Sequence, residues 1–370
     1  MKVNPPRRGK IEQSHSKIGQ SSSGRAAKEA GPPPANGVAR PTIIDVARLA
    51  SVSPATVSNA LNGRTNVDEA TRKRVLAAVQ KLGYTPNLRA RRLRTGRADT
   101  IAIFSSMSFA VAGGRARLGF TMEIAAAAAS RALESGIALV LVPPLATGGS
   151  PIHDLHIDGA IVVEPLQDDP EIALLTQRGI PVVSIGRQPG NAPVPFVDIR
   201  PYDVADLLIR HLHQRSNGKI GLIVGAQPRY THLETERAYR DFARAHKMRP
   251  IVRQVDEARG EQGGHDAAVE LLTAHPDLGA LFVSVDVFAT GARRAAAELG
   301  RDVPSQLKLA TRYDGIHARE CNPALTAVNL HLDELAFTAV ELLLECIAGR
   351  SHRDSIVGPL ATLIERGSSA

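Results

Sequence analysis

The spacing of apolar and polar positions differs between two parts of this chain. Between Thr42 and Tyr84, apolar residues recur three to four positions apart, the spacing of helices that bury one face. After Thr100, apolar runs of four to six residues alternate with further helical stretches. Buried strands that alternate with helices are typical of parallel sheets covered by helices on both faces, and about 270 residues of this pattern are too many for one sheet. We therefore predict a small all-α head followed by an α/β body of two lobes.

The first two predicted helices each begin at a cap. Thr42 and Asp45 have capping-box spacing at the start of the first helix. Ser53 is a suitable N-cap for the second, and Pro54 fits its first position because the N–H that proline lacks would be unpaired there. The inward faces of the two helices are assigned to Ile44, Val46, Ala47, Ala50, Val57 and Leu61. We expect the second helix to end at Asn62–Gly63.

A third helix is predicted over the apolar side of the first two. Asp68 caps it and Gly83 stops it. Its apolar face consists of Val75, Val79 and Leu82. Two helices joined by a short turn, with a third packed over them, form a helix-turn-helix domain. An ordinary small helical bundle has the same pattern, so the spacing alone leaves DNA binding open.

The distribution of charge favours DNA binding. Residues 1–40 carry eight Lys or Arg and two Asp or Glu, and residues 41–99 carry eleven and four, which gives +6 and +7. The whole chain carries +8, so +8 less +13 leaves −5 for the rest. A basic head on an acidic body indicates a polyanionic partner for the head alone. Residues 1–40 are too poor in apolar side chains to fold, and we expect a disordered basic tail, either solvated or a weak DNA arm.

Composition and motifs disfavour several other classes of protein. No run of about 18 apolar residues indicates a membrane span, and the basic N-terminus lacks the apolar core of a secretory signal. Cys321 and Cys346 lack C-x-x-C spacing and are interpreted as reduced structural thiols. The turns GAQPRY and GGRARLG match no nucleotide-binding motif, and the histidines show no metal-ligand spacing. We therefore predict no catalytic residue, no cofactor and no metal.

Residues Thr42 to Leu93 resemble the DNA-binding head and hinge of the LacI/GalR family of bacterial transcription regulators. The resemblance is carried by TIIDVARLASVSPATVSNALNG and VDEATRKRVLAAVQKLGYTPNLRARRL, and more weakly by DGAIVVEP, VSVDVFATGARRAAAELGRDVP, TRYDG and NPALTAV. It implies a homodimer with a helix-turn-helix head, a hinge helix and a body like a periplasmic sugar-binding protein. Its DNA-binding domain would span 41–85, its hinge 86–99 and its effector-binding and dimerisation domain 100–370. Within the body, the N-lobe is expected over about 100–224 and 327–355, and the C-lobe over about 225–326 and 356–370.

The resemblance also implies which residues meet DNA. The second helix would lie in the major groove, where Pro54, Ala55 and Asn59 occupy the base-reading positions. Asparagine can pair with adenine, and alanine can touch a thymine methyl group. The resemblance assigns phosphate contacts or positioning roles to Thr42, Thr56, Ser58, Asn62, Asn66 and Thr71. Ser51 stands where the family often has glycine, so a positive φ there would strain it by about 1 kcal/mol.

The hinge matches the family at several positions. The resemblance assigns DNA contacts in this segment to Tyr84, Asn87, Ala90, Arg91, Leu93 and Arg94. The resemblance implies that Leu93 is wedged into the minor groove at the operator centre beside its dimer mate, and that it kinks the duplex. The alternative for Leu93 is packing on the head.

The effector site departs from the family pattern. Asp314, next to Tyr313, matches the family's effector aspartate, and Asp286 is kept although Val285 replaces the usual asparagine. Arg237 is nearest to the expected arginine but lies about two residues out of register. We assign the effector contacts to Arg200, Arg237, Asp286, Tyr313 and Asp314.

The nature of the effector is left open among a sugar, a sugar phosphate and a sugar acid. The extra cations Arg200 and Arg312 would suit an anion, while an internal salt bridge at the lobe interface is the alternative for each.

The sequence thus predicts a cytoplasmic regulator that is nucleoid-associated when bound, and a repressor. It would bind a palindromic double-stranded operator as a homodimer under the control of a small metabolite. A dimer is favoured over a tetramer because no heptad tail follows GPLATLIERGSSA. The alternatives are a transport-type or other non-regulatory small-molecule-binding protein and, less favoured, an enzyme on the same α/β lobes.

Overall fold

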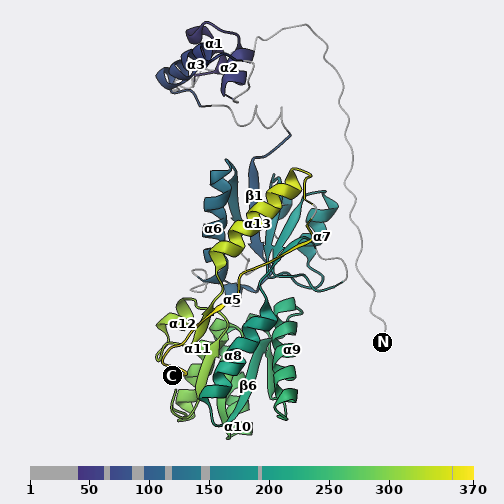
Figure 1. Cartoon of the computed structure of the whole chain (residues 1–370), viewed down its shortest axis with the longest axis vertical. Helices are drawn as coiled ribbons and strands as arrows, with labels where there is room; N and C mark the ends of the chain where they lie inside the picture. The colour runs from purple at the N-terminus through teal and green to yellow at the C-terminus, as the bar shows by residue number, and fades with distance from the viewer. Residues whose placement is uncertain are drawn as a thin grey trace, which may run out of the picture. The chain divides into compact units, whose positions relative to one another are not determined.

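The chain divides after Asn87 into two compact units, a helical head and an α/β body. Figure 1 shows the computed structural model, which describes residues 41–61, 67–85, 96–112, 119–142, 151–190, 194–351 and 353–370. No helix within these ranges is long and apolar enough to cross a membrane.

Three helices form the head around one apolar core. They are α1 (Ile43–Ala50), α2 (Pro54–Leu61) and α3 (Glu69–Leu82). Val46, Val57 and Val75, one from each helix, have no exposed surface. The other buried residues of this core are Ala47, Ala50, Ala60, Val67, Ala78 and Tyr84. The predicted helix-turn-helix arrangement is therefore confirmed.

The predicted caps of the first two helices are confirmed by hydrogen bonds. The Asp45 carboxylate accepts a hydrogen bond from the backbone N–H of Thr42 at 2.9 Å. Ser53 Oγ accepts one from the backbone N–H of Thr56 at 3.1 Å, and Pro54 is the first residue of α2. An N-cap bond of this kind contributes about 1 kcal/mol, so Ser53 and Pro54 start a new helix rather than interrupt an old one.

Left-handed residues end α1 and α3. Gly83 follows α3 at φ 59°, which glycine adopts without steric penalty. Ser51 follows α1 at φ 55°, where its Cβ crowds the backbone at a cost of about 1 kcal/mol. The start of α3 is also as predicted, because Asp68 accepts a hydrogen bond from the Thr71 backbone N–H at 2.8 Å.

One predicted core position in the head is wrong. Ile44 is 57% exposed. The buried stripe of α1 instead starts from the partly buried Ile43 and continues through Val46, Ala47 and Ala50, which are the i+3, i+4 and i+7 positions. Two adjacent isoleucines offered two starting points for the stripe, and packing against α2 and α3 selects the first.

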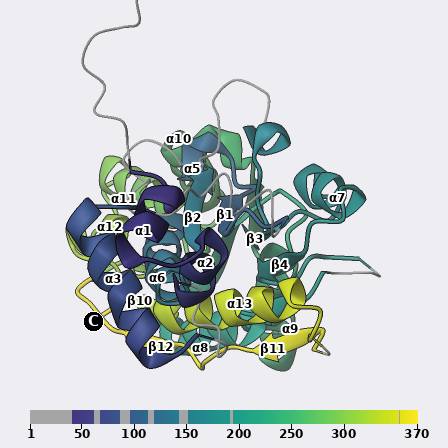
Figure 2. The same ribbon diagram turned by 90° about the horizontal axis from the view of Figure 1, so that it is seen from above.

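The N-lobe of the body is a parallel sheet in the order β11-β5-β4-β3-β1-β2. Its strands are β1 (Thr100–Ser105), β2 (Ala138–Val142), β3 (Gly159–Val163), β4 (Val182–Ile185), β5 (Phe196–Asp198) and β11 (Ser355–Val357). Its helices are α6 (Phe120–Glu134), α7 (Pro170–Gln177) and α13 (Leu332–Ile347), with a 3-10 turn, η2 (Pro151–Asp154). The short α5 (Phe109–Ala112) follows β1 but packs on the C-lobe, against η3 (Glu257–Arg259) and α10 (Gly260–Ala274). Helices α6 and α13 pack side by side on one face and α7 lies on the other (Figure 2).

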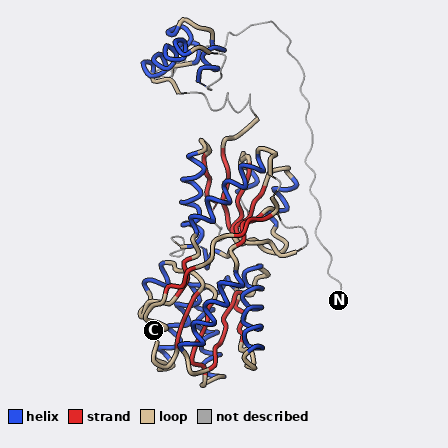
Figure 3. The backbone as a smooth tube through the Cα atoms, in the orientation of Figure 1, coloured by secondary structure: helices blue, strands red, loops and turns tan. Residues whose placement is uncertain are grey.

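The C-lobe repeats this plan around a parallel sheet in the order β7-β6-β8-β9. Its strands are β6 (Lys219–Gly225), β7 (Val252–Val255), β8 (Leu278–Val283) and β9 (Lys308–Thr311), with an antiparallel pair, β10 (Ala327–Asn329) and β12 (Thr362–Ile364). Its helices are α8 (Pro201–Arg215), α9 (Tyr230–Ala245), α10 (Gly260–Ala274), α11 (Asp286–Glu298) and α12 (Ile316–Glu320), with a 3-10 turn, η3 (Glu257–Arg259). Helices pack in pairs, α8 with α9 and α10 with α11, so the strands lie between helical layers (Figure 3).

The chain crosses between the lobes three times. The crossings lie between β5 and α8, between β10 and α13, and between β11 and β12. The first crossing therefore falls at residues 198–201, not near residue 224 as the sequence predicted, because α8 and β6 belong to the C-lobe. Apolar periodicity identifies a buried strand or helix but does not say which of two sheets it joins.

Candidate nucleic-acid interface and interlobe pocket

One face of α2 is exposed within the described part of the head. Pro54 and Ala55 are exposed, and Asn59 is half-buried one turn further on. Val57 and Ala60 point the other way, into the head core. The three predicted base-reading residues therefore share the outer side of the helix, and Asn59 alone among them carries a side chain that can donate and accept hydrogen bonds.

The described head also carries polar and basic groups on its surface. Thr56, at the start of α2, lies 2.9 Å from Ser53 through their hydroxyl oxygens. Thr42 and Thr71 lie at the starts of α1 and α3, and helix N-termini attract phosphates because their N–H groups and dipoles point outward. The exposed cations of the described head are Arg48, Lys73, Arg74 and Lys81. Such groups position a duplex without reading its sequence.

The structure covers only part of the predicted DNA-binding set. Tyr84 is buried in the head core, with 8% of its surface exposed, so its ring packs within the head. Ser58 lies half-buried on α2. Seven predicted contacts lie outside the described residues, namely Asn62, Asn66, Asn87, Ala90, Arg91, Leu93 and Arg94. They stay predictions.

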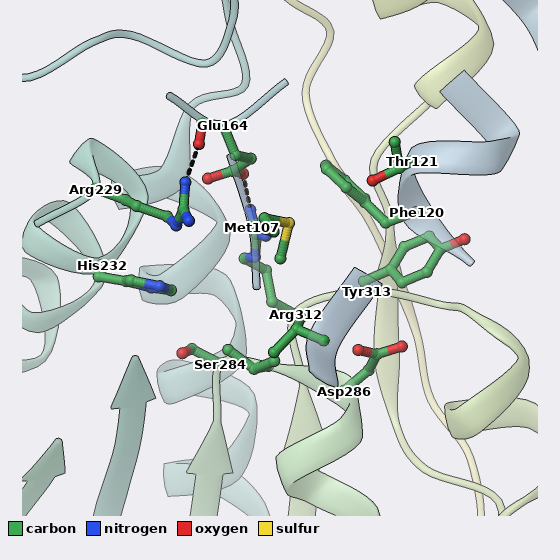
Figure 4. Close-up of a pocket in the computed structure, with 12 residues that line it drawn as sticks. Met107, Phe120, Thr121, Glu164, Arg229, His232, Ser284, Asp286, Arg312 and Tyr313 are labelled. Atoms are coloured by element: carbon green, nitrogen blue, oxygen red, sulfur yellow. Dashed lines mark hydrogen bonds and ion pairs between the residues drawn. The ribbon is translucent and has the colours of Figure 1, made fainter. Parts of the chain in front are cut away.

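A pocket lies between the two lobes of the body, where the strands of both sheets end. It is lined by Met107, Val111, Phe120, Thr121, Glu164, Arg229, His232, Ser284, Val285, Asp286, Arg312 and Tyr313 (Figure 4). Glu164 directly follows β3 in the N-lobe, and Arg312 directly follows β9 in the C-lobe. Residues beyond the carboxyl ends of parallel strands are where α/β sheets bind ligands.

Buried charges in the pocket are paired within the C-lobe. Arg229 Nε and Nη2 lie 3.0 and 3.1 Å from the two carboxylate oxygens of Glu257, and His232 Nε2 lies 2.7 Å from Glu257 Oε1. Burial acts to raise the pKa of Glu257, but the hydrogen bonds from His232 and Arg229 outweigh it and lower the pKa to about 2. Glu257 is therefore ionised at neutral pH and holds Arg229 in place.

The same arginine and a second one reach across to the N-lobe. Arg229 donates from Nη1 to the carbonyl of Glu164 and from Nη2 to the carbonyl of Ser106, the latter at 2.7 Å. Arg312 Nη1 lies 2.8 Å from Glu164 Oε1. Burial acts to raise the pKa of Glu164, but the Arg312 guanidinium holds it below its ordinary value. Glu164 is thus ionised, and two arginines of the opposite lobe bind it, Arg312 at its carboxylate and Arg229 at its backbone carbonyl.

Several polar groups of the pocket have no partner within the described chain. They include Ser284 Oγ, His232 Nδ1 and Arg312 Nε. Burial also raises the pKa of the Asp286 carboxyl and of the Tyr313 hydroxyl. Buried polar atoms are nearly always hydrogen-bonded, so this set is suited to a polar ligand that both donates and accepts hydrogen bonds.

The predicted effector residues divide into two groups. Asp286 and Tyr313 line the pocket. Asp314 does not, because its carboxylate forms ion pairs with Arg319 and Arg366. It therefore holds its own loop and the C-terminal segment together.

The two arginines assigned from the sequence also lie outside the pocket lining. Arg200 is the N-cap of α8 at the first crossing and pairs with Asp203 at 2.7 Å. Arg237 is a surface residue of α9, 58% exposed at its side chain, which pairs with Glu234 and stacks 4.6 Å from the Tyr202 ring centroid. Neither supplies a free cation to a ligand in the pocket.

The sequence reasoning missed three pocket residues with titratable side chains, Glu164, Arg229 and His232. Glu164 comes directly after the apolar run of β3, and the position after a buried strand was the one available signal for it. Arg229 lies in the turn GAQPRY and His232 in the first turn of α9, and nothing in the local sequence relates either to the N-lobe. Their partnership with Glu164 and Glu257 exists only in the folded body.

Comparison with known families divides the chain as the structure does. Residues 42–87 match the model of bacterial regulatory proteins of the lacI family. Residues 209–369 match the model of a periplasmic binding protein-like domain.

Two characterised relatives are similar over most of their length. An HTH-type transcriptional regulator, CelR of Thermobifida fusca, is 31% identical over 330 residues, which are 84% of this chain and 93% of that protein. An HTH-type transcriptional repressor, PurR of Escherichia coli O139:H28, is 30% identical over 346 residues, 89% of this chain and 97% of that protein.

Solved structures agree with this similarity. A complex of the transcriptional regulator CelR with cellobiose matches with a TM-score of 0.66 at 28% identity. The match covers 89% of this chain and 100% of that one. The Lac repressor dimer bound to operator and the anti-inducer ONPF has a TM-score of 0.72 at 24% identity, over 89% of this chain and 98% of that one. The second likeness is one of fold.

Proposed function

The chain belongs to the lacI family of bacterial regulatory proteins, and from this premise we propose that it is a repressor that binds a palindromic operator as a homodimer under the control of a small molecule. The observation that carries the proposal is that one chain contains two candidate sites. The head offers the outer face of α2 to DNA, and the body offers an interlobe pocket with unpartnered polar groups.

We propose a neutral polar effector, of which a sugar is the example. Arg229 and Arg312, the two arginines that line the pocket, are each paired with a glutamate in this structure, so neither offers a free positive charge to an anion. An effector that displaces Arg312 would meet the Glu164 carboxylate in its place. The raised pKa of Asp286 is a further argument, because burial outweighs the attraction of the nearby His317 and Arg312, and such a carboxyl disfavours more negative charge beside it. The relative named in a complex with cellobiose binds a neutral sugar.

The pairing of Arg312 and Arg200 gives no support to an anionic effector. Arg312 and Arg200 were the cations that favoured a sugar phosphate or acid. Arg312 pairs with Glu164 and Arg200 pairs with Asp203, the second outside the pocket. Internal pairing, the alternative raised for both residues, is what the folded body contains.

Control of DNA binding follows from the position of the pocket. A ligand that contacts both lobes stabilises one angle between them, and it can shift the population of DNA-binding molecules only by the difference in its affinity for the two states. The relatives are transcription regulators, and we propose that this chain likewise has no catalytic activity. Because its partner is chromosomal DNA, we place its action in the bacterial cytoplasm, at the nucleoid when bound.

Selection of bound duplexes from a random pool tests the DNA half of the proposal. The full-length chain should enrich a palindrome, and its affinity for that palindrome should exceed its affinity for scrambled DNA by at least 10³-fold at physiological salt. Binding with no preference that disappears at moderate salt would show only the electrostatic attraction of the basic head. A transport-type binding protein would enrich nothing.

A further inference from the structure

Arg312 extends across the interlobe pocket and makes its strongest contact with the opposite lobe. Its backbone directly follows β9 in the C-lobe, and its Nη1 lies 2.8 Å from Glu164 Oε1 of the N-lobe (Figure 4). The side chains of Arg312 and Glu164 are 7% and 2% exposed. The ion pair is therefore shielded from water, and salt screens it far less than a surface pair.

A second group of the N-lobe also faces this guanidinium. Arg312 Cζ lies 5.4 Å from the centroid of the Phe120 ring, at the first turn of α6. Phe120 is fixed in turn by an edge-to-face contact with Tyr313 at 5.4 Å between ring centroids. A carboxylate in the plane of a guanidinium and an aromatic ring over it are the groups with which proteins bind guanidinium ligands.

The carboxylate of this subsite is held rigidly. Glu164 has a left-handed backbone at φ 54°, which a residue with a Cβ adopts only where its surroundings enforce it. Two hydrogen bonds hold this backbone: Arg229, itself fixed by Glu257, donates to the Glu164 carbonyl, and the Glu164 N–H donates to the Ile185 carbonyl at 2.8 Å. The cavity that remains beside these side chains measures about 30 Å³, which is room for water-sized molecules only.

We propose that Arg312 is a tethered ligand of the chain's own pocket. Its guanidinium occupies a subsite formed by Glu164 and Phe120 of the N-lobe, holds the two lobes together, and must be displaced before an effector can enter. The inference rests on the proposed function only in taking this pocket as the effector site. The guanidinium subsite itself can be tested without any effector or DNA.

Removal of the tethered group should open the subsite to a free guanidinium. The experiment is a thermal melt of full-length Arg312→Ala with methylguanidinium chloride at 0 to about 20 mM, against sodium chloride at equal ionic strength. Arg312→Ala should melt lower than the parent chain, and methylguanidinium should recover at least half of that loss with saturation. The parent chain should gain nothing, because its own side chain fills the subsite.

Two variants keep this result interpretable. Arg237→Ala removes an exposed arginine outside the pocket and should show no methylguanidinium effect. Arg312→Ala combined with Glu164→Gln removes the carboxylate and should lose the recovery. No saturable recovery in a folded Arg312→Ala chain, or equal recovery in the double variant, would overturn the subsite. If Arg312→Ala does not fold, Glu164→Gln alone should enlarge the radius of gyration in solution scattering, and an unchanged radius would overturn the contact between lobes.

The regulatory role is tested separately on DNA. With an operator selected from a random pool, Arg312→Ala should change operator affinity by at least fivefold, and methylguanidinium should restore it. Restored melting with unchanged operator affinity would overturn the regulatory role and leave an ordinary structural ion pair. Failure to select any operator would count against the proposed function, while the melting result would still decide on the guanidinium subsite.

Discussion

The Arg229 guanidinium and the Glu257 carboxylate form a two-point ion pair inside the C-lobe, with N–O distances of 3.0 and 3.1 Å and side chains that are 2% and 1% exposed. This pair aims the remaining N–H groups of Arg229 at carbonyls of the N-lobe. The position of the lobes therefore depends on a carboxylate of the C-lobe that acts through Arg229.

Stability in acid should depend on Glu257. Its pKa falls from an ordinary 4.5 to about 2 in the folded body, so its contribution is complete above pH 4.5 and is lost as the pH falls toward 2. This group accounts for roughly 3 kcal/mol of the free energy of unfolding. Glu257→Gln should destabilise the body at pH 7 and flatten its stability between pH 5 and 3, as measured by urea titration at each pH.

Asp286 provides a control of opposite sign. Burial raises its pKa, so the folded body carries a cost for ionised Asp286 at neutral pH and loses that cost on acidification. Asp286→Asn should therefore leave the body as stable as the parent chain at pH 7, or more stable. A matching loss in both variants at pH 7 would contradict the assignment of the ion pair.

The turn between α1 and α2 should gain stability from glycine. Ser51 has φ 55°, and replacing it removes steric strain of about 1 kcal/mol, partly offset by the greater freedom of glycine in the unfolded chain. Ser51→Gly should slow hydrogen exchange of the buried α1 and α3 amides in the full-length chain. Gly83→Ala, which introduces the same strain at φ 59°, should speed it. Faster exchange in Ser51→Gly would mean that the serine side chain stabilises the turn.

Base reading should depend on Asn59. It is the one residue of the set Pro54, Ala55 and Asn59 whose side chain can form two hydrogen bonds to a base, each such pair being worth about 1 to 3 kcal/mol. Asn59→Ala should weaken operator binding by about 10- to 100-fold and leave binding to scrambled DNA unchanged. Arg74→Ala, at an exposed cation of α3, should weaken both equally and reduce the salt dependence. Fluorescence anisotropy on the two duplexes measures both.

Leu93 lies outside the described residues, and its role remains a prediction from the resemblance. If it is wedged into the minor groove, Leu93→Ala should reduce operator affinity at least tenfold more than affinity for scrambled DNA, because only the operator complex gains contacts from the kink. Equal losses on both duplexes would instead indicate that Leu93 packs on the head.

Features that depend on neighbouring residues were predictable from the sequence. The caps at Ser53 and Asp68 involve residues three positions apart, so the sequence alone contains both partners. The strand–helix alternation likewise identified parallel sheets. The prediction that Ile44 faces inward was wrong because two adjacent isoleucines fit the helical period and only packing distinguishes them.

Features that depend on distant residues were not predictable. Arg229 and Glu164 are 65 positions apart, and Arg312 and Glu164 are 148 apart, so no local pattern connects them. Arg237, which the resemblance assigned to the effector, lies outside the pocket lining. A helix face can be predicted from periodicity, but which face turns toward the pocket depends on how α9 packs on its sheet.

The central claim is that a neutral ligand in the interlobe pocket controls the binding of the head to DNA. Its most direct test is fluorescence anisotropy of the full-length chain on its selected operator, titrated with neutral mono- and disaccharides and with the phosphate ester of each. The account predicts that a neutral sugar changes operator affinity at least fivefold, that its phosphate does not, and that Asp286→Asn binds the operator but loses the response. A response to the phosphate ester alone, or a response undiminished in Asp286→Asn, would contradict it.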